Sequence, residues 1–163
     1  MSHMPPGDQG LNAPQHMHIQ HVLEVWAVRT PDAPALLASG RMPLTYGRLH
    51  KHVDDVVQRL RALGVGCTDR VALVLPTGPE MAVAFLAVAA GATCAPLNPG
   101  YGANDFNSYF ADLKVQALIL PGEMDSPARA VAHARGLRMI ELSPELEAEA
   151  GEALLVEEAS GIG

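Results

Sequence analysis

The chain has 163 residues, of which 48% are apolar and only 4% aromatic. This composition suits one domain that buries roughly 70% of its unfolded surface, and it excludes disorder of the whole chain. The formal net charge is −7, yet residues 1–140 carry eleven basic and eleven acidic side chains, and the seven remaining acids all follow them. A neutral body with an acidic end offers no basic surface for nucleic acid, and no apolar run reaches the ~18 residues of a membrane span.

The first residues are not expected to belong to the folded part. Residues 1–4, Met-Ser-His-Met, resemble a remnant of a cloning vector, and the Pro- and Gly-rich stretch after them is typical of a disordered lead-in as far as residue 18. A helix is then predicted over residues 19–28, because apolar side chains recur at three- and four-residue steps.

A short hairpin and a long helix follow. Residues 35–38 and 42–44 are typical of two strands that turn at Ser39-Gly40. Thr45 is expected to N-cap a helix over residues 46–63, and Gly64 to end it. One face of this helix carries an apolar stripe and is predicted to face the core. The other face is predicted to meet water, with the side chains of Arg48, His50, Lys51, His52, Asp55, Arg59 and Arg61.

Strands and helices alternate in the next part of the chain. Apolar strands are predicted over residues 70–75, 93–97, 116–120 and 137–142, with a helix after each of the first three. The spacing of Thr77 and Glu80 predicts a capping box, and Ser126-Pro127 is typical of a helix start. Because the strands are apolar on both faces, the fold class is α/β, with a parallel sheet flanked by helices and a small hairpin near the start.

The acidic end is predicted to lie outside this fold. Ser143-Pro144-Glu145 indicates a short acidic helix, and the glutamates after it indicate a solvated tail. The expected division is therefore a lead-in over 1–18, an α/β subdomain over 19–145, and an acidic tail or linker over 146–163 toward a missing remainder.

The turns after the strands are where a parallel sheet binds ligands. They lie at residues 76–78, 98–102 and 121–122, and none has a dinucleotide-binding or phosphate-loop pattern. In the first, Pro79 lacks an N–H donor and Glu80 would compete with an anion, so we expect a helix cap there.

Other reactive side chains are not placed for catalysis. His18 and His21 share a helical face, but without a matching set of ligands we expect surface histidines. The serines lie in predicted turns, caps or the tail, with no G-x-S-x-G pattern. Asp54 and Asp55 diverge by about 100° on a helix and cannot act as a carboxylate pair. The sequence therefore predicts no catalytic, cofactor-binding or metal-binding residue in this chain.

The two cysteines, Cys67 and Cys94, lie far apart and lack a metal or redox spacing. Cys94 falls in a predicted strand and is expected to be a buried, small apolar side chain. With no disulfide framework and no secretory signal, the sequence favours the cytoplasm.

Two motifs carry a resemblance to a known family. Residues 44–49 read LTYGRL and residues 84–101 read AFLAVAAGATCAPLNPGY. In this order and spacing they resemble the first two core motifs of the adenylate-forming, AMP-binding ligases, which include acyl-CoA synthetases, luciferases and nonribosomal adenylation domains. Weaker matches at 29–35, 69–72, 78–80 and 105–113 extend the resemblance over residues 25–142. The nearest type is an acyl-CoA synthetase, of the small-carboxylate or the oxalate–CoA ligase-like kind, rather than a peptide-synthetase domain.

The resemblance implies an enzyme that uses ATP, Mg²⁺ and CoA. Such enzymes turn a carboxylate into an acyl-adenylate, release pyrophosphate, and pass the acyl group to the CoA thiol. The family's third motif, a Ser/Thr/Gly-rich phosphate loop that ends in lysine, does not occur in this sequence. The resemblance thus implies an N-terminal fragment that is inactive by itself and has the missing C-terminal part as its partner. Thr77 stands where members of the family commonly have Asn, and Gly102 stands where they often have a basic residue. Because of these two differences, the resemblance does not imply ligand contacts from these loops.

Two other functions remain open at this stage. One is a stand-alone module that binds a small molecule or complements a separate enzyme piece. The other is a flavodoxin-like domain, disfavoured because the strand over 71–75 ends in Pro-Thr rather than an acidic cluster. In a fragment, the face that the remainder covers is expected to form an exposed apolar patch, and hence a homodimer or a lattice contact.

Overall fold

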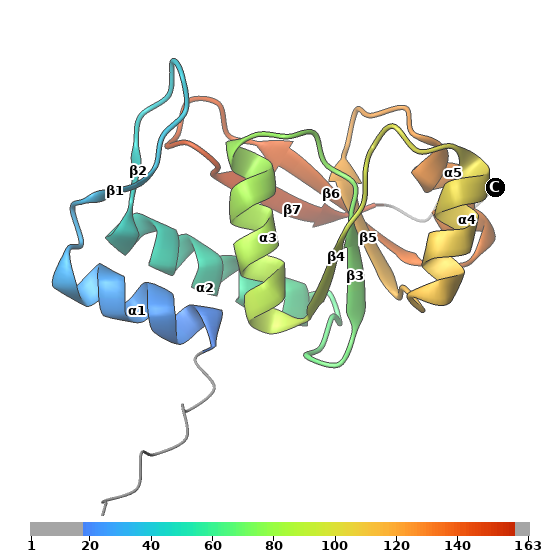
Figure 1. The fold of residues 1–163 in the computed structure, drawn as a ribbon, viewed down its shortest axis with the longest axis horizontal. Helices are drawn as coiled ribbons and strands as arrows, with labels where there is room; N and C mark the ends of the chain where they lie inside the picture. Colours follow the sequence, from blue (N-terminus) through green and yellow to red (C-terminus); the bar gives the residue numbers. More distant parts are fainter. Residues whose placement is uncertain (1–17, 159–163) are drawn as a thin grey trace, which may run out of the picture.

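The computed structural model describes residues 18–158 and shows a sheet between two layers of helices (Figure 1). Its elements follow in the order α1 (Ile19–Arg29), β1 (Pro34–Leu36), β2 (Leu44–Thr45), α2 (Tyr46–Ala62), β3 (Arg70–Leu73), α3 (Pro79–Gly91), β4 (Thr93–Pro96), α4 (Ala103–Asp112), β5 (Ala117–Pro121), α5 (Pro127–Ala134), β6 (Arg138–Pro144) and β7 (Ala153–Glu157). The predicted hairpin, the four predicted strands and the helices between them are present, with ends that differ by no more than two residues.

The main sheet has five strands in the order β4-β3-β5-β6-β7. Strands β4, β3, β5 and β6 run parallel to one another, whereas β7 runs antiparallel to β6. Strands β1 and β2 form a separate antiparallel pair. The predicted fold class, a parallel sheet flanked by helices with a small hairpin, is confirmed.

Side chains of the three central strands, β3, β5 and β6, alternate between two apolar cores. Val71 and Leu73 of β3 point toward α1, α2 and α3, and Ala72 between them points toward α4 and α5. The same alternation along β5 and β6 divides the interior into two clusters, one on each face of the sheet. The first cluster is the larger because three helices cover that face.

Helix α2 has the predicted ends and the predicted inner face. The Thr45 hydroxyl accepts a hydrogen bond from the backbone N–H of Arg48 at 3.3 Å. Gly64 has φ +78°, a conformation that favours glycine and ends the helix. The predicted stripe also includes Leu63, which is partly buried against the same core. Its other five residues are buried: Leu49, Val53, Val56, Val57 and Leu60.

Two predicted features of the secondary structure are wrong. Thr77 does not cap α3, since the N-cap residue is Gly78 and no side chain makes the capping hydrogen bond. There is no acidic helix after Ser143, because β6 continues to Pro144 and, after a loop, Ala153–Glu157 forms the strand β7. Ala153 and Leu155 bury their side chains in the first core cluster, and this apolar contact outweighs the acidic character of the segment. The division of the chain into domains stays a prediction, and residues 1–17 and 159–163 lie outside the described part.

Candidate functional site

The turn between β3 and α3 is occupied by the chain's own charges. The Glu80 carboxylate accepts a hydrogen bond from Nη1 of Arg41 at 2.9 Å, and both side chains are largely buried. Glu80 thus keeps negative charge in the first turn of α3, where an anion would otherwise bind. Pro79 at the first position leaves one N–H donor fewer.

The turn between β4 and α4 is also closed internally. The backbone N–H of Gly100 donates to Oδ1 of Asn98 at 2.9 Å, and the N–H of Gly102 donates to Oδ2 of Asp105 at 3.1 Å. Two backbone donors of this turn are therefore bound to side chains of the same turn.

In the turn after β5, the guanidinium of Arg129 binds the backbone carbonyl oxygens. Nη2 of Arg129 donates to the carbonyl oxygens of Pro121 and Gly122, at 3.1 and 3.0 Å. Nη1 of Arg129 meets the carboxylates of Glu141 and Glu158, at 2.9 and 2.6 Å. Although a hollow of about 310 Å³ lies beside this turn, its nearest cation is already neutralised by two carboxylates.

A second hollow, here called the α2–β7 groove, lies between α2 and the C-terminal strand. It has a volume of about 380 Å³ and is lined by nine residues of α2, β7 and the loop before β7: His52, Asp55, Val56, Arg59, Glu145, Glu152, Ala153, Leu154 and Leu155. Nε of Arg59 donates to the carbonyl oxygen of Leu155 at 3.1 Å and joins α2 to β7 along the groove.

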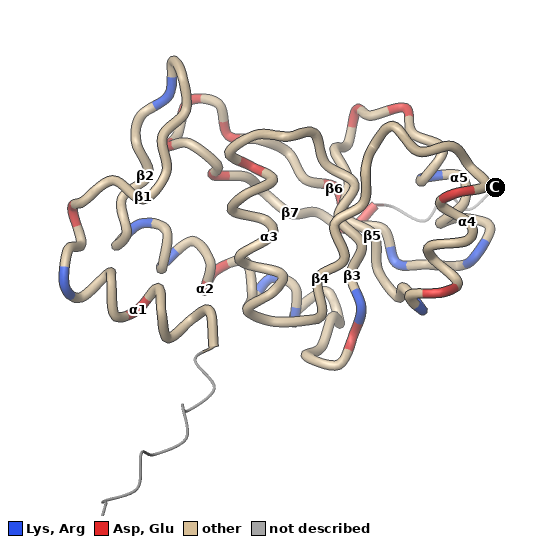
Figure 2. The backbone as a smooth tube through the Cα atoms, in the orientation of Figure 1, with Lys and Arg blue, Asp and Glu red and all other residues tan. Residues whose placement is uncertain are grey.

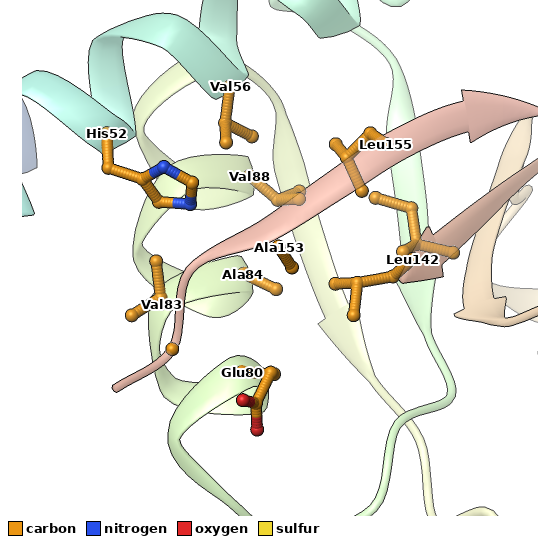
Figure 3. A pocket seen from close by; sticks show the side chains of 11 residues that line it. His52, Val56, Glu80, Val83, Ala84, Val88, Leu142, Ala153 and Leu155 are labelled. Atoms are coloured by element: carbon orange, nitrogen blue, oxygen red, sulfur yellow. The ribbon is translucent and has the colours of Figure 1, made fainter. Parts of the chain in front are cut away.

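His52 lies in this groove and not in open solvent, which corrects the prediction from the sequence. Figure 3 shows its imidazole beside Val56 and Val83, above the narrow apolar space between α2, α3 and β7. That space measures about 10 Å³, which is at the lower limit for one water molecule. Burial lowers the pKa of His52, and the nearby carboxylates of Asp55 and Glu145 only partly oppose this effect.

Arg48 holds the loop before β7 through two glutamates. It binds Glu149 through two hydrogen bonds of 3.1 Å and reaches Glu152 at the same distance. The hydrogen bond from Arg48 lowers the pKa of Glu149. Burial, reinforced by the neighbouring Glu149, raises the pKa of Glu152. These glutamates were predicted to be solvated, but they serve as ion-pair partners of the folded body.

Arg41 of the β1–β2 hairpin binds the backbone of the same loop. Its guanidinium donates to the carbonyl oxygens of Glu145 and Glu149, at 2.9 and 2.8 Å, besides its bond to Glu80. The sequence around Arg41 gives no sign of this role, since an arginine in a short turn is usually exposed.

The histidines and serines that the sequence singled out lie at exposed or helix-capping positions. Among residues 18–158, no group of three or more histidines, cysteines, aspartates or glutamates is placed to hold a metal ion. His21 lies 3.6 Å from Glu24 on the exposed side of α1. Ser126 N-caps α5 by accepting from the N–H of Ala128, and the Ser108 hydroxyl donates to a carbonyl of its own helix.

Comparison with protein families gives one match over most of the chain. Residues 23–160 match the family described as AMP-binding enzyme. A probable CoA ligase, CCL9, of Humulus lupulus is 41% identical over 112 residues, which are 68% of this chain and 21% of that protein. An oxalate–CoA ligase of Arabidopsis thaliana is 39% identical over 113 residues, which are 68% of this chain and 22% of that protein. The chain thus spans about a fifth of the length of these relatives.

Solved structures show the same fold. A putative long-chain-fatty-acid CoA ligase from Rhodopseudomonas palustris superposes with a TM-score of 0.68 over 81% of this chain and 35% of that chain, at 22% identity. The N-terminal domain of FACL13 from Mycobacterium tuberculosis superposes with a TM-score of 0.61 over 72% of this chain and 30% of that chain, at 26% identity. The first likeness concerns the fold alone, because its sequence identity is low.

Proposed function

The chain belongs to the AMP-binding enzyme family, and from this premise we propose that it forms the N-terminal part of an ATP-dependent carboxylate–CoA ligase. In the whole ligase a carboxylate oxygen attacks the α-phosphorus of ATP and pyrophosphate leaves. The CoA sulfur then attacks the acyl carbon and AMP leaves. We assign to this segment the scaffold for that reaction and none of the reacting groups.

The observation that carries this proposal is that polar groups at the three strand-to-helix turns are bound by other groups of the same chain. A triphosphate needs free N–H donors or cations at such turns. Here the donors of Gly100 and Gly102 are bound to side chains, Glu80 occupies the start of α3, and two carboxylates neutralise Arg129. These contacts support the proposal that this segment supplies none of the groups that hold ATP.

Exchange of labelled pyrophosphate into ATP tests the assignment. The purified chain, given ATP, Mg²⁺ and a panel of carboxylates that includes oxalate, acetate and a long-chain fatty acid, is expected to give no exchange above the blank. Clear exchange with any of these acids would show that the chain carries its own reacting groups.

A chimera supplies the positive arm of the test. In the Arabidopsis oxalate–CoA ligase, the 113-residue segment that matches the present chain is replaced by the corresponding segment of the present chain. The two segments are 39% identical. We expect the chimera to fold and to retain pyrophosphate exchange with oxalate. A folded chimera without exchange would count against an equivalent scaffold role.

The remaining parts of the proposal concern partners and location. We propose that the C-terminal part of the same enzyme is the partner of this segment, since the relatives extend well beyond the matched region. We propose a cytoplasmic location, which agrees with two free cysteines, one of them exposed. Among the described helices, none has the length and apolarity needed to cross a bilayer. The comparisons do not favour the stand-alone binding module.

A further inference from the structure

The α2–β7 groove is long rather than round. Helix α2 lines it with His52, Asp55, Val56 and Arg59, which occupy positions i, i+3, i+4 and i+7 on one face of the helix. At 1.5 Å per residue, positions 52 and 59 lie about 10 Å apart along the helix axis. The groove therefore follows two turns of α2 and suits a linear molecule better than a single ion.

The end of the groove near His52 is acidic. The carboxylate of Glu145 lies close enough to His52 to act on its charge, and among residues 18–158 it has no cationic partner. Arg48 is shared by two carboxylates, those of Glu149 and Glu152, so this group keeps one net negative charge. Figure 2 shows acidic positions along the loop before β7 and basic positions along α2. This end can therefore accept an ammonium group.

The other end of the groove is basic. Nε of Arg59 donates to the carbonyl oxygen of Leu155 at 3.1 Å, and within residues 18–158 this is the one hydrogen bond of its guanidinium. Nη1 and Nη2 are left to form the two parallel hydrogen bonds that arginine makes with a carboxylate. Asp55, the one carboxylate that α2 contributes to the groove, is already paired with Lys51.

Apolar side chains lie between the two charged ends. They are Val56 of α2 and Ala153, Leu154 and Leu155 of β7. Because 57% of Leu154 is exposed, it offers apolar surface to the methylene groups of a ligand. The groove volume of about 380 Å³ falls in the range of small-molecule sites, roughly 300–1,000 Å³.

We propose that the α2–β7 groove binds a linear ω-aminocarboxylate, a zwitterion whose ammonium and carboxylate groups are separated by an apolar chain. The ammonium pairs with Glu145, the carboxylate pairs with Arg59, and the methylene groups pack on Leu154. In 6-aminohexanoate the two charged groups are roughly 8 Å apart, which suits partners set about 10 Å apart along α2. The site goes beyond the ligase scaffold, since it lies apart from the three strand-to-helix turns and requires no ATP.

An NMR titration of the ¹⁵N-labelled chain with 6-aminohexanoate tests the site. A ligand of this size in an open groove is expected to have a Kd of about 1 mM, and the shifted signals should belong to residues 52–59 and 153–155. Hexanoate lacks the ammonium group and hexylamine lacks the carboxylate, so each should bind about tenfold more weakly. Equal binding of the three probes would overturn the proposal, and so would the absence of saturable shifts with 6-aminohexanoate.

Two charge-removing variants assign the ends of the groove. Glu145→Gln should reduce the affinity for 6-aminohexanoate to that for hexanoate, and Arg59→Gln should reduce it to that for hexylamine. The matched controls are Glu147→Gln in the same loop and Arg61→Gln on the same helix. Neither control residue lines the groove, so both variants should bind as the wild type does. Equal losses in variants and controls would count against the assigned contacts.

A charge reversal gives a test that does not depend on lost binding. Arg59 also holds Leu155, so circular dichroism checks the fold of Arg59→Gln, whereas Glu145 is exposed and its substitution should leave the fold intact. Glu145→Lys should make the groove prefer adipate, a dicarboxylate of the same chain length, over 6-aminohexanoate. An unchanged preference in Glu145→Lys would show that this carboxylate does not select the ligand.

Discussion

The Arg41 guanidinium and the Glu80 carboxylate meet at 2.9 Å, with only 13% and 19% of their side chains exposed. Glu80 stands in the first turn of α3, whereas Arg41 belongs to the β1–β2 hairpin and also binds backbone carbonyls of the loop before β7. One side chain thus joins three segments that are distant in the sequence.

Replacing Arg41 by methionine should destabilise the fold by about 3 kcal/mol, because the substitution leaves a largely buried carboxylate without its partner. Urea unfolding monitored by circular dichroism measures this change. The control is Lys51→Met, which breaks the exposed pair between Lys51 and Asp55 and should cost less than about 1 kcal/mol. Equal losses in the two variants would show that the Arg41 pair contributes no more than a surface contact.

Gly151→Ala should be strongly destabilising. Gly151 has φ +89°, and a methyl group there would lie 2.5 Å from Cγ2 of Val83 and 2.8 Å from the carbonyl oxygen of Pro79. We expect a loss of about 3 kcal/mol from backbone strain and overpacking together. Gly136 is the matched control, since it has φ +65° with nothing within 4 Å of the added methyl group. Gly136→Ala should cost about 1–2 kcal/mol, and a Gly151→Ala loss no larger than this would contradict the predicted clash.

The two glutamates bound by Arg48 should give opposite pH dependences. The pKa of Glu149 is lowered from 4.5, so its stabilising contribution is present above pH 4.5 and is lost as the pH falls through the lowered value. The pKa of Glu152 is raised from 4.5, so its contribution is present below pH 4.5 and is lost as the pH rises through the raised value.

Free energies of unfolding measured between pH 3 and pH 8 separate these two contributions. Glu149→Gln should flatten the acid side of the profile, and Glu152→Gln should flatten the side above pH 4.5. Profiles that stay parallel to that of the wild type would mean that neither carboxyl group changes its pKa on folding.

His52 should titrate below its ordinary range. Burial lowers its pKa from 6.5, so the stability that neutral His52 supports is present above pH 6.5 and is lost as the pH falls through the lowered value. Proton NMR of the imidazole C–H signals follows this titration, and the signal that is absent in His52→Gln identifies the residue. A midpoint at or above 6.5 would place the imidazole in solvent, as the sequence predicted.

The two cysteines should differ in reactivity. Burial raises the pKa of Cys94 to about 12, and only the thiolate reacts with alkylating reagents. Cys67 is exposed, so iodoacetamide at pH 8 should modify Cys67 first and Cys94 far more slowly. Mass spectrometry of Cys67→Ser and Cys94→Ser resolves the two rates. Equal rates would mean that β4 opens readily at its free edge.

The sequence predicted the sheet and its helices well because these elements depend on local patterns. Apolar runs of four to six residues between capped helices indicate buried parallel strands wherever they occur. Thr45, Gly64 and Ser126 act as the predicted caps, since capping depends on residues within one turn. Thr77 is the exception, because Glu80 pairs with the distant Arg41 instead of completing a capping box.

The features that the sequence missed all depend on contacts between remote segments. Strand β7 forms because Leu155 pairs with Leu142 and buries its side chain beneath α2, although six of the fourteen residues from Glu145 to Glu158 are glutamates. His52 was expected in solvent because it borders the apolar stripe of α2, whereas α3, β7 and the loop before β7 lie around it. The apolar run over residues 153–156 was the one sequence signal that indicated a strand, and in the structure Ala153 and Leu155 are buried while Leu154 and Val156 are exposed.

The hydrogen bond from Arg41 to the carbonyl of Glu149 spans 108 positions of the chain, and this separation has a consequence for biosynthesis. At about 5–20 residues per second on the ribosome, the hairpin emerges roughly 5–20 s before the loop that anchors it. During that interval Arg41 can pair with Glu80 but not yet with the loop before β7. The β1–β2 hairpin is therefore synthesised early but gains its contacts with the loop before β7 late. Slowing translation before residue 145 should prolong the exposure of the hairpin to proteases.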